Sequence, residues 1–301
     1  MKLVFFGTSE FAVPALRAMA PSVVLVVSQP DRPSGRGMRL QPSPVKRVAL
    51  EQGLLVETPE KSRASDFVER LITLEPDALL VAAYGQILST KVLESAHRGG
   101  LNLHGSILPK YRGAAPIQRA ILNGEAETGI TLMQMDRGMD TGDIIAIERT
   151  PIHPHETYGQ LQGRLAEIAA QMAVEWMPRV TTGEYPRVPQ DHAEATLAPK
   201  VEKHEAELQT NRPALHEYNR FRAFTPAPGA FLKTVFGAMK VLECRPVDGR
   251  GEAGHLLPGG CVLAFADGAL DLLRVQPEGK KAMTGRDFMN GLRLRPGMRL
   301  A

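Results

Sequence analysis

The sequence predicts an α/β protein: a parallel sheet covered by helices on both faces, followed by a small β-barrel domain. The first half of the chain alternates short apolar runs with helix-like segments, which is typical of strand–crossover–strand units. The last third carries short strand-like pieces separated by glycines, which is typical of a small barrel. Between these parts, residues 181–203 contain many charges and prolines but little periodicity, which predicts a linker.

The first half supplies the strands of the expected sheet. A turn at 7–10 leads from the first apolar run into a helix. Ligands of open parallel sheets bind beyond the carboxyl ends of the strands, so residues just after each run are candidates for a site. The expected strands lie at 3–6, 23–27, 77–83 and 100–103.

A long polar segment and a long helix complete this half. Residues 29–44 contain four prolines, two glycines and three arginines, which predicts an irregular surface loop. Loops of this length in a compact domain are usually functional. Residues 160–177 predict an amphipathic helix, whose apolar face is formed by Leu161, Leu165, Ile168, Met172 and Trp176.

The C-terminal part begins with a short helix over residues 213–223. We expect an N-terminal domain over residues 1–185, a linker over 186–206 and a second domain over 207–301. The strands of this second domain are expected at 231–234, 239–243, 260–265 and 269–275.

Composition points to a cytoplasmic enzyme. Hydrophobic residues make up 43% of the chain and charged residues 23%, as in ordinary globular proteins. No apolar run reaches the length of about 18 residues that a membrane span needs. The N-terminal apolar run stops at Gly7 and polar residues follow, which fits a buried first strand better than a signal peptide. Cys244 and Cys261 suit a reducing compartment.

The net charge of +3 is unevenly distributed along the chain. Residues 206–301 hold 14 Lys and Arg against 9 Asp and Glu, whereas residues 1–205 carry a small acidic excess. This asymmetry predicts a polyanionic partner for the C-terminal part. The alternative is a basic surface that is merely solvated.

Two short segments carry side chains suited to acyl transfer. Asn102 and His104 are two residues apart, and therefore on the same side of an extended segment. Asp140 lies in a glycine-containing, turn-forming stretch. An amide can donate to a developing oxyanion, and an imidazole can move a proton near neutral pH. The carboxylate can keep the imidazole charged or accept a proton from an attacking amine. No enzyme nucleophile is needed if the substrate brings that amine.

A longer set of motifs surrounds these residues, from residue 104 to residue 145. In these motifs the chain resembles the folate-dependent formyltransferases, which move a formyl group from 10-formyltetrahydrofolate to amines. The resemblance covers nearly the whole chain. It implies a Rossmann-like formyltransferase domain followed by an OB-like β-barrel domain, with Asn102, His104 and Asp140 as the catalytic residues.

The resemblance also implies a folate site, whereas the sequence gives no support for a metal site. The co-substrate is 10-formyltetrahydrofolate, a small-molecule donor. His153 and His155 are close in sequence, but no metal-ligand set accompanies them. The residues that correspond to the folate-contacting segments of the family are Ser106, Ile107, Leu108, Pro109, Tyr84, Gly85 and Ile87, of which Ile107 replaces the usual leucine.

Within this family, the loop at 29–44 and the basic tail resemble those of the members that act on methionyl initiator tRNA. In those members the loop inserts at the acceptor end of the tRNA, and the barrel domain binds the tRNA. A monomer that formylates methionyl initiator tRNA for translation initiation is therefore expected. The residues expected to contact the tRNA are Arg32, Arg36, Arg39, Lys280 and Lys281.

Three alternative functions are compatible with parts of the sequence. A formyltransferase that acts on a nucleotide-linked amino sugar would share the catalytic residues, but the arginine-rich loop and the basic tail disfavour it. A nicotinamide-dependent dehydrogenase is disfavoured because residues 7–12 lack the second and third glycines of the dinucleotide fingerprint. A purely RNA-binding module would leave Asn102, His104 and Asp140 without a purpose.

Overall fold

The structure, a computed structural model, describes residues 1–34 and 39–301. Its contacts divide the chain into two compact units. Unit 1 comprises Met1–Pro116, Glu127–Pro151 and Gln162–Pro199, and unit 2 comprises Ile117–Ala126, Ile152–Leu161 and Lys200–Ala301. The domain limits expected from the sequence, at residues 185 and 207, stay a prediction.

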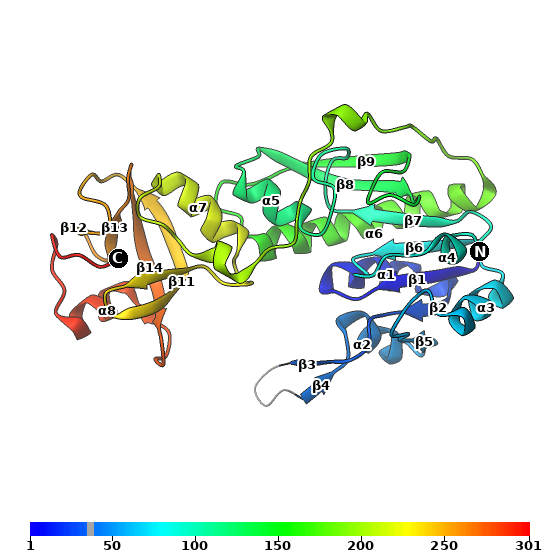
Figure 1. Cartoon of the computed structure of the whole chain (residues 1–301), viewed down its shortest axis with the longest axis horizontal. Helices are drawn as coiled ribbons and strands as arrows, with labels where there is room; N and C mark the ends of the chain where they lie inside the picture. The colour runs from blue at the N-terminus through cyan, green and yellow to red at the C-terminus, as the bar shows by residue number, and fades with distance from the viewer. Residues whose placement is uncertain (35–38) are drawn as a thin grey trace. The chain divides into compact units, whose positions relative to one another are not determined.

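Within the described residues, unit 1 contains a seven-stranded sheet of order β5-β2-β1-β6-β7-β8-β9 (Figure 1). Strands β5, β2, β1, β6 and β7 pair in parallel, whereas β8 and β9 are antiparallel to their neighbours. The predicted parallel sheet is confirmed, and two unexpected antiparallel strands extend one edge. The strands are β1 (Leu3–Gly7), β2 (Val23–Val27), β5 (Val56–Glu57), β6 (Ala78–Ala82), β7 (Gly100–His104), β8 (Glu127–Gln134) and β9 (Ile144–Pro151).

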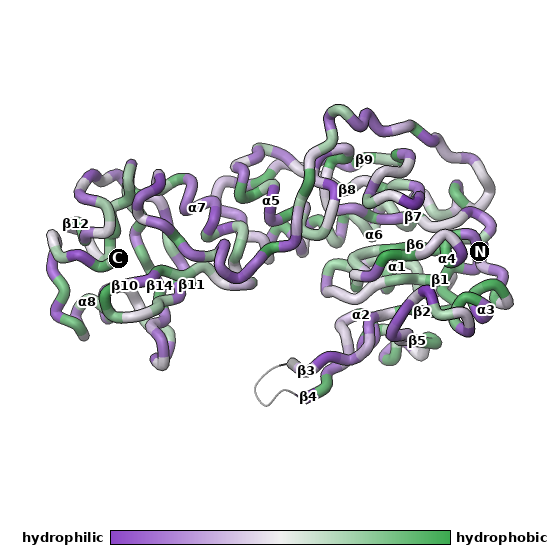
Figure 2. The backbone as a smooth tube through the Cα atoms, viewed as in Figure 1, coloured by the Kyte–Doolittle hydropathy of each residue, from purple (hydrophilic) through white to green (hydrophobic). Residues whose placement is uncertain are grey.

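The sheet of unit 1 is buried on both faces. Val4 and Phe6 of β1 pack with Phe67 of α3, and the intervening residue Phe5, which faces the other side, is also fully buried. Figure 2 shows that β1 and β6 are among the most hydrophobic segments. No helix in the described part of the chain has both the length and the apolar character to cross a membrane. The α-helices up to residue 182 are α1 (Val13–Met19), α2 (Pro44–Glu51), α3 (Ser65–Leu74), α4 (Thr90–Leu93), α5 (Pro116–Leu122) and α6 (Tyr158–Thr182), and the 3-10 turns of unit 1 are η1 (Glu10–Ala12), η2 (Ala20–Ser22) and η3 (His192–Glu194).

The strand order places the candidate site. β2 lies on one side of β1 and β6 on the other, so the winding of the sheet reverses between β1 and β6. Ligands of such sheets bind near this reversal, beyond the carboxyl ends of the strands. Thr8, just after β1, donates its hydroxyl hydrogen to the carbonyl of Tyr84, just after β6, at 2.7 Å. His104 ends the neighbouring strand β7.

The segment at 29–44 differs from the irregular loop that the sequence predicted. β3 (Arg32–Ser34) pairs antiparallel with β4 (Arg39–Gln41), so the described part of the segment is a hairpin, and the expectation of an irregular loop was wrong there. Near its base, Lys46 Nζ donates to Asp31 Oδ1 at 2.8 Å. Short exposed strands lack the apolar alternation that identifies a strand in sequence, and the prolines of the segment indicate a loop.

Unit 2 contains, in its described residues, a six-stranded antiparallel sheet of order β10-β11-β14-β13-β12, with β15 paired to β14. Its core includes Tyr218 and Phe221 of α7, Leu270 and Leu272 of β14, and Phe288 of α8. The pairing leaves β10 and β12 as edges, as in a partly open barrel of the OB type. The elements are η4 (Lys203–Ala206), α7 (Ala214–Ala223), β10 (Phe231–Thr234), β11 (Gly237–Val247), β12 (Leu256–Leu257), β13 (Val262–Ala264), β14 (Ala269–Pro277), β15 (Met283–Thr284) and α8 (Gly285–Leu292).

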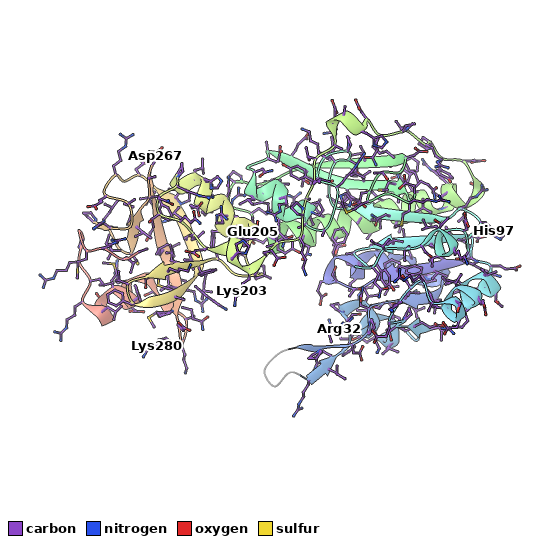
Figure 3. All side chains as sticks on the ribbon, viewed as in Figure 1. Arg32, His97, Lys203, Glu205, Asp267 and Lys280 are labelled. Atoms are coloured by element: carbon purple, nitrogen blue, oxygen red, sulfur yellow. The ribbon has the colours of Figure 1, made fainter. Side chains whose placement is uncertain are left out.

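A bidentate ion pair joins α5 to η4 within unit 2. Arg119 Nη1 and Nη2 lie 2.6 and 3.0 Å from the two carboxylate oxygens of Glu205, which Figure 3 labels. These side chains are only 13% and 22% exposed. The hydrogen bond from Arg119 is the main cause that lowers the pKa of Glu205. The ionised carboxylate therefore stabilises the folded state.

We expect Glu205→Gln to lower the free energy of unfolding by about 1 to 2 kcal/mol at neutral pH, because a charge-assisted pair is lost. The pKa of Glu205 is lower in the folded than in the unfolded state, so this contribution is present above the ordinary carboxyl pKa of about 4.3 and is lost as the pH falls through the folded value. Urea unfolding at neutral and acidic pH measures both effects. The control is Glu127→Gln, whose partner Arg149 is 56% exposed and whose loss should cost only a few tenths of a kcal/mol. Equal losses for the two variants would contradict the expectation.

Candidate active site

Unit 1 brings Asn102, His104 and Asp140 together, and we call these three residues the polar triad. Asn102 and His104 belong to β7, and Asp140 lies between β8 and β9. Asn102 Nδ2 donates to Asp140 Oδ1 at 3.3 Å, and His104 Nδ1 lies 3.6 Å from Asp140 Oδ2. The side chain of His104 is 6% exposed and that of Asp140 16%. The triad thus combines a hydrogen-bond donor, a proton carrier and a carboxylate in a largely buried place.

The two nitrogens of His104 have different partners. Nε2 lies 2.9 Å from the carbonyl oxygen of Tyr111. Because a carbonyl can only accept, Nε2 is the donor in this bond and carries a hydrogen. The other ring nitrogen, Nδ1, faces the Asp140 carboxylate. Tyr111 is itself held by a 2.8 Å bond from its N–H to Thr196 Oγ1.

Asp140 adopts a left-handed backbone with φ of +55°. This conformation costs a residue with a side chain about 1–2 kcal/mol, although aspartate adopts it more readily than most. The N–H of Gly113 donates to Asp140 Oδ2 at 2.9 Å.

Two glycines near Asp140 are required by their surroundings. Gly113 has φ of +116°, and a Cβ there would lie 2.9 Å from the carbonyl oxygen of Ala198. At Gly142 a Cβ would collide with the carbonyl oxygen of Gln134. Only glycine fits either position.

The expected folate segment after β7 is held by Thr131 of β8. Thr131 Oγ1 donates to the carbonyl of Ser106 at 2.6 Å and accepts the N–H of Leu108 at 3.1 Å. Ser106 Oγ donates to the carbonyl of Lys110 at 2.7 Å. Ser106 and Leu108 are buried, whereas Ile107 and Pro109 are half-buried. The backbone of the segment is thus fixed, and its half-buried side chains are the ones available to a ligand.

In the second expected folate segment, the side chains point to different environments. Tyr84 is 2% exposed, its ring meets Phe6 edge-on at 5.2 Å, and burial raises its pKa to about 12. Because this side chain belongs to the core, Tyr84 can offer a ligand its backbone only. Gly85 is exposed with φ of +88°, and Ile87 is 92% exposed. Gly85 and Ile87 are therefore accessible to a ligand.

The expected tRNA-binding residues are found in both units. Arg32 and Arg39 are exposed on the β3–β4 hairpin of unit 1, whereas Arg36 lies outside the described residues. Lys280 and Lys281 are exposed in the turn between β14 and β15 of unit 2. Figure 3 labels Arg32 and Lys280, which extend from these two segments. Within the described residues all four side chains are accessible to a partner.

His153 and His155 belong to unit 2, whereas the residues of the polar triad belong to unit 1. His155 forms a 2.9 Å hydrogen bond through Nδ1 with the hydroxyl of Tyr218. Over the residues that the structure describes, no group of three or more His, Cys, Asp or Glu is placed to hold a metal ion.

A second set of residues surrounds the triad and was not expected from the sequence. Residues 188–198, which we call the strap, form isolated bridges with residues 112 and 144. Within the strap, Gln190 is 6% exposed and donates to the backbone carbonyls of Asp140 and Gly142. Arg112, also 6% exposed, donates to Gln190. These contacts join residues 48 to 78 positions apart, which no local pattern reveals.

Comparison with families and relatives agrees with this geometry. The family described as "Formyl transferase" matches residues 1–181, and "Formyl transferase, C-terminal domain" matches residues 200–293. The methionyl-tRNA formyltransferase of Myxococcus xanthus is 44% identical over 98% of this chain and 96% of its own length. The enzymes of the same name from Parvibaculum lavamentivorans and Thermus thermophilus are also 44% identical, each over 100% of this chain and 100% and 99% of their own lengths.

Solved structures share the fold at low identity. An N-formyltransferase from Helicobacter canadensis, solved with folinic acid and dTDP-3-aminofucose, has a TM-score of 0.68 at 19% identity, over 90% of this chain and 97% of its own. HypX from Aquifex aeolicus with tetrahydrofolic acid has a TM-score of 0.66 at 15% identity, over 100% of this chain and 50% of its own. These likenesses support the fold alone. Together with the full-length relatives, the two family matches show that this chain belongs to the formyl transferase family and, within it, to the methionyl-tRNA formyltransferases.

Proposed function

We propose that this chain transfers the formyl group of 10-formyltetrahydrofolate to the α-amino group of methionyl initiator tRNA. The observation that carries the formyl transfer is the convergence of Asn102, His104 and Asp140 in one largely buried place, and the full-length relatives at 44% identity support the acceptor. The hydroxyl of Ser106, two residues after His104, is already committed to the carbonyl of Lys110. The site thus suits a substrate that supplies its own amine nucleophile.

The reaction forms one C–N bond and breaks another. The neutral α-amine attacks the formyl carbon, and a tetrahedral centre with a negative oxygen results. Asn102 Nδ2 and a proton on His104 Nδ1 would donate to this oxygen, each donor lowering the barrier by about 3–4 kcal/mol. The bond from the formyl carbon to N10 of the folate then breaks. The attacking nitrogen loses one proton and N10 gains one, and Asp140 is the proposed group beside this transfer.

The proposed folate contacts follow from what each residue offers. Gly85 and Ile87 offer an exposed backbone and an exposed apolar side chain after β6, and Tyr84 offers its backbone. Ile107 and Pro109 offer half-buried side chains. The backbone of their segment is held by Thr131, which bonds to the backbone of Ser106 and of Leu108. Apolar walls with a few placed polar groups are typical of a site for a flat ring ligand.

Basic side chains in both units support the proposed tRNA partner. We propose phosphate contacts for Arg32, Arg36, Arg39, Lys280 and Lys281, in a monomer that works in the cytoplasm during translation initiation. RNA acceptor ends are recognised through phosphates, shape and single-stranded features, which suits an exposed arginine-bearing hairpin.

Arg39→Ala tests the hairpin contact. If Arg39 neutralises one phosphate, tRNA affinity should fall, and the slope of log K against log salt should decrease in magnitude by about one. Filter binding between 50 and 200 mM salt, roughly the range over which such slopes are resolved, measures both. Arg149→Ala removes the same charge from β9 of unit 1 and should leave the slope unchanged. An unchanged slope for Arg39→Ala would exclude a direct phosphate contact.

The experiment for the whole proposal is a formyl-transfer assay. The purified chain is given 10-formyltetrahydrofolate with methionyl initiator tRNA, and in parallel with a nucleotide-linked amino sugar. Formylation of the tRNA alone is expected. Transfer to the sugar alone would keep the triad chemistry but overturn the proposed acceptor.

A further inference from the structure

The strap contains a buried amide that bonds to the backbone of Asp140, a member of the triad, and to its neighbour Gly142. Gln190 Nε2 donates to the carbonyl of Asp140 at 2.9 Å and to that of Gly142 at 2.7 Å. Its Oε1 accepts from Arg112 Nε at 3.1 Å and from Arg112 Nη2 at 2.6 Å. One side chain thus connects the backbone that carries the candidate carboxylate to a buried guanidinium.

The orientation of this amide is determined by its partners. A carbonyl only accepts and a guanidinium only donates, so the reversed amide would oppose two carbonyls with an oxygen and Arg112 with an NH₂ group. Arg112 is itself oriented, because its Nη2 also donates to His192 Nδ1 at 3.0 Å. Its backbone N–H and carbonyl bond to Thr196 and Ala198 at 2.8 and 2.7 Å. The strap therefore holds Arg112, and Arg112 fixes the direction of the amide.

The backbone that Gln190 holds is in an unusual state. Asp140 has a positive φ, which residues with side chains rarely adopt, so external contacts are needed to keep it there. Gln190 holds the carbonyl of this residue, while Gly113, next to Arg112, holds its carboxylate through a 2.9 Å bond. Asp140 is thus fixed at two points, at its carbonyl by Gln190 and at its carboxylate by Gly113. Both contacts help to hold the carboxylate 3.6 Å from His104 Nδ1.

We propose that Gln190 is a positioning residue for formyl transfer. Its amide, whose orientation Arg112 fixes, holds the Asp140 backbone in place, and we call this contact the lock. This inference rests on the proposed function. Gln190 touches no reacting atom. A displacement of about 1 Å in a catalytic group can reduce a rate about 100-fold, so loss of the lock should affect the chemical step and leave substrate binding intact.

Two substitutions distinguish the positioning effect of Gln190 from any effect that this residue has on folding. Gln190→Met removes both the NH₂ group that donates to the two carbonyls and the oxygen that accepts from Arg112. Gln190→Glu keeps an oxygen for Arg112 but opposes the two carbonyls with a second oxygen, so the strap stays anchored while the donors are lost. The matched control is Val188→Ala, a neighbouring strap residue whose side chain is 56% exposed and whose bridge to Ile144 uses backbone atoms only.

We expect kcat to fall about 10- to 100-fold in both Gln190 variants, with KM for tRNA and for folate within about threefold of the parent. Val188→Ala should match the parent. In an Asp140→Ala background, Gln190→Glu should reduce kcat less than twofold further, because the lock has no carboxylate left to place. Should Gln190→Met fail to fold, Gln190→Glu carries the test alone.

Hydrogen exchange gives a readout that does not depend on activity. Amides of residues 138–143 should exchange at least about tenfold faster in Gln190→Glu and at the parental rate in Val188→Ala. A parent without formyl-transfer activity would remove the proposed function, while exchange would still decide whether the lock exists. The positioning role is overturned if kcat of Gln190→Glu is within twofold of the parent, or if its full loss is repeated in the Asp140→Ala background.

Discussion

Replacement of His104 by alanine is expected to lower kcat for formyl transfer at least about 100-fold, the usual effect of removing one oxyanion donor. His104 Nδ1 lies 3.6 Å from Asp140 Oδ2, while its Nε2 is occupied by the carbonyl of Tyr111, so Nδ1 is the nitrogen that we propose donates to the substrate oxygen. Loss of the ring therefore removes the charged donor. Single-turnover kinetics with methionyl initiator tRNA measures the chemical step directly.

A change in folding must be separated from this loss. His104→Ala removes the hydrogen bond that Nε2 donates to the Tyr111 carbonyl, which by itself costs about 1 kcal/mol. His104→Gln provides an amide N–H for that carbonyl but no proton carrier, so it should fold better and remain as inactive. His97→Ala is the matched control, because His97 is exposed in unit 1 and lies outside the triad. Activity of His104→Gln within tenfold of the parent would remove the imidazole from the mechanism.

Asn102→Ala should have a similar size of effect, with less disturbance of the fold. Asn102 is half-buried, and its amide bonds to Asp140 at 3.3 Å, a weak contact. Its main expected role is thus toward the substrate oxygen and not toward stability.

Strands β1, β2, β6 and β7 were predictable because their signal is local, whereas β8 was not expected although it is also buried. β1 and β6 are buried along their whole length, so they appear in the sequence as continuous apolar runs. β9 is mostly half-buried or exposed, and its pattern gives no clear period. The hairpin of β3 and β4 was hidden for the same reason, since its described side chains are exposed and Pro33 lies within β3.

In the candidate site too, the residues placed by local spacing were predictable and those with distant partners were not. Asn102 and His104 were placed on one side of a strand by their spacing alone, and the structure places them there. Asp140 comes from 38 residues away, so no spacing rule places it beside them; its chemistry made it a candidate partner, and the resemblance of its motif to a known family supported the grouping. Gln190 and Arg112 were absent from the predictions. A buried polar side chain whose partners are distant in sequence looks like any surface glutamine or arginine.

Asp140→Asn is expected to lower kcat at least about 100-fold while leaving the stability of the fold nearly unchanged. Asparagine tolerates the left-handed backbone that Asp140 adopts, and its side-chain oxygen can still accept the N–H of Gly113. What it removes is the negative charge beside His104 Nδ1. Asp140→Ala removes the charge and the hydrogen bonds together, and should also lose about 1 kcal/mol of unfolding free energy.

The comparison of these two variants isolates what the carboxylate contributes. If its charge is essential, whether as proton acceptor or beside the imidazole, both variants should lose activity to a similar extent, although only Asp140→Ala loses stability. Asp143→Asn, in the same loop, removes a half-exposed charge paired with Arg187 at 3.0 Å and should change kcat little. An Asp140→Asn variant with kcat within tenfold of the parent would show that hydrogen bonding at this position suffices. Asp140 would then be an orienting residue like Gln190, and proton transfer from the amine would have to go to solvent or to the folate directly.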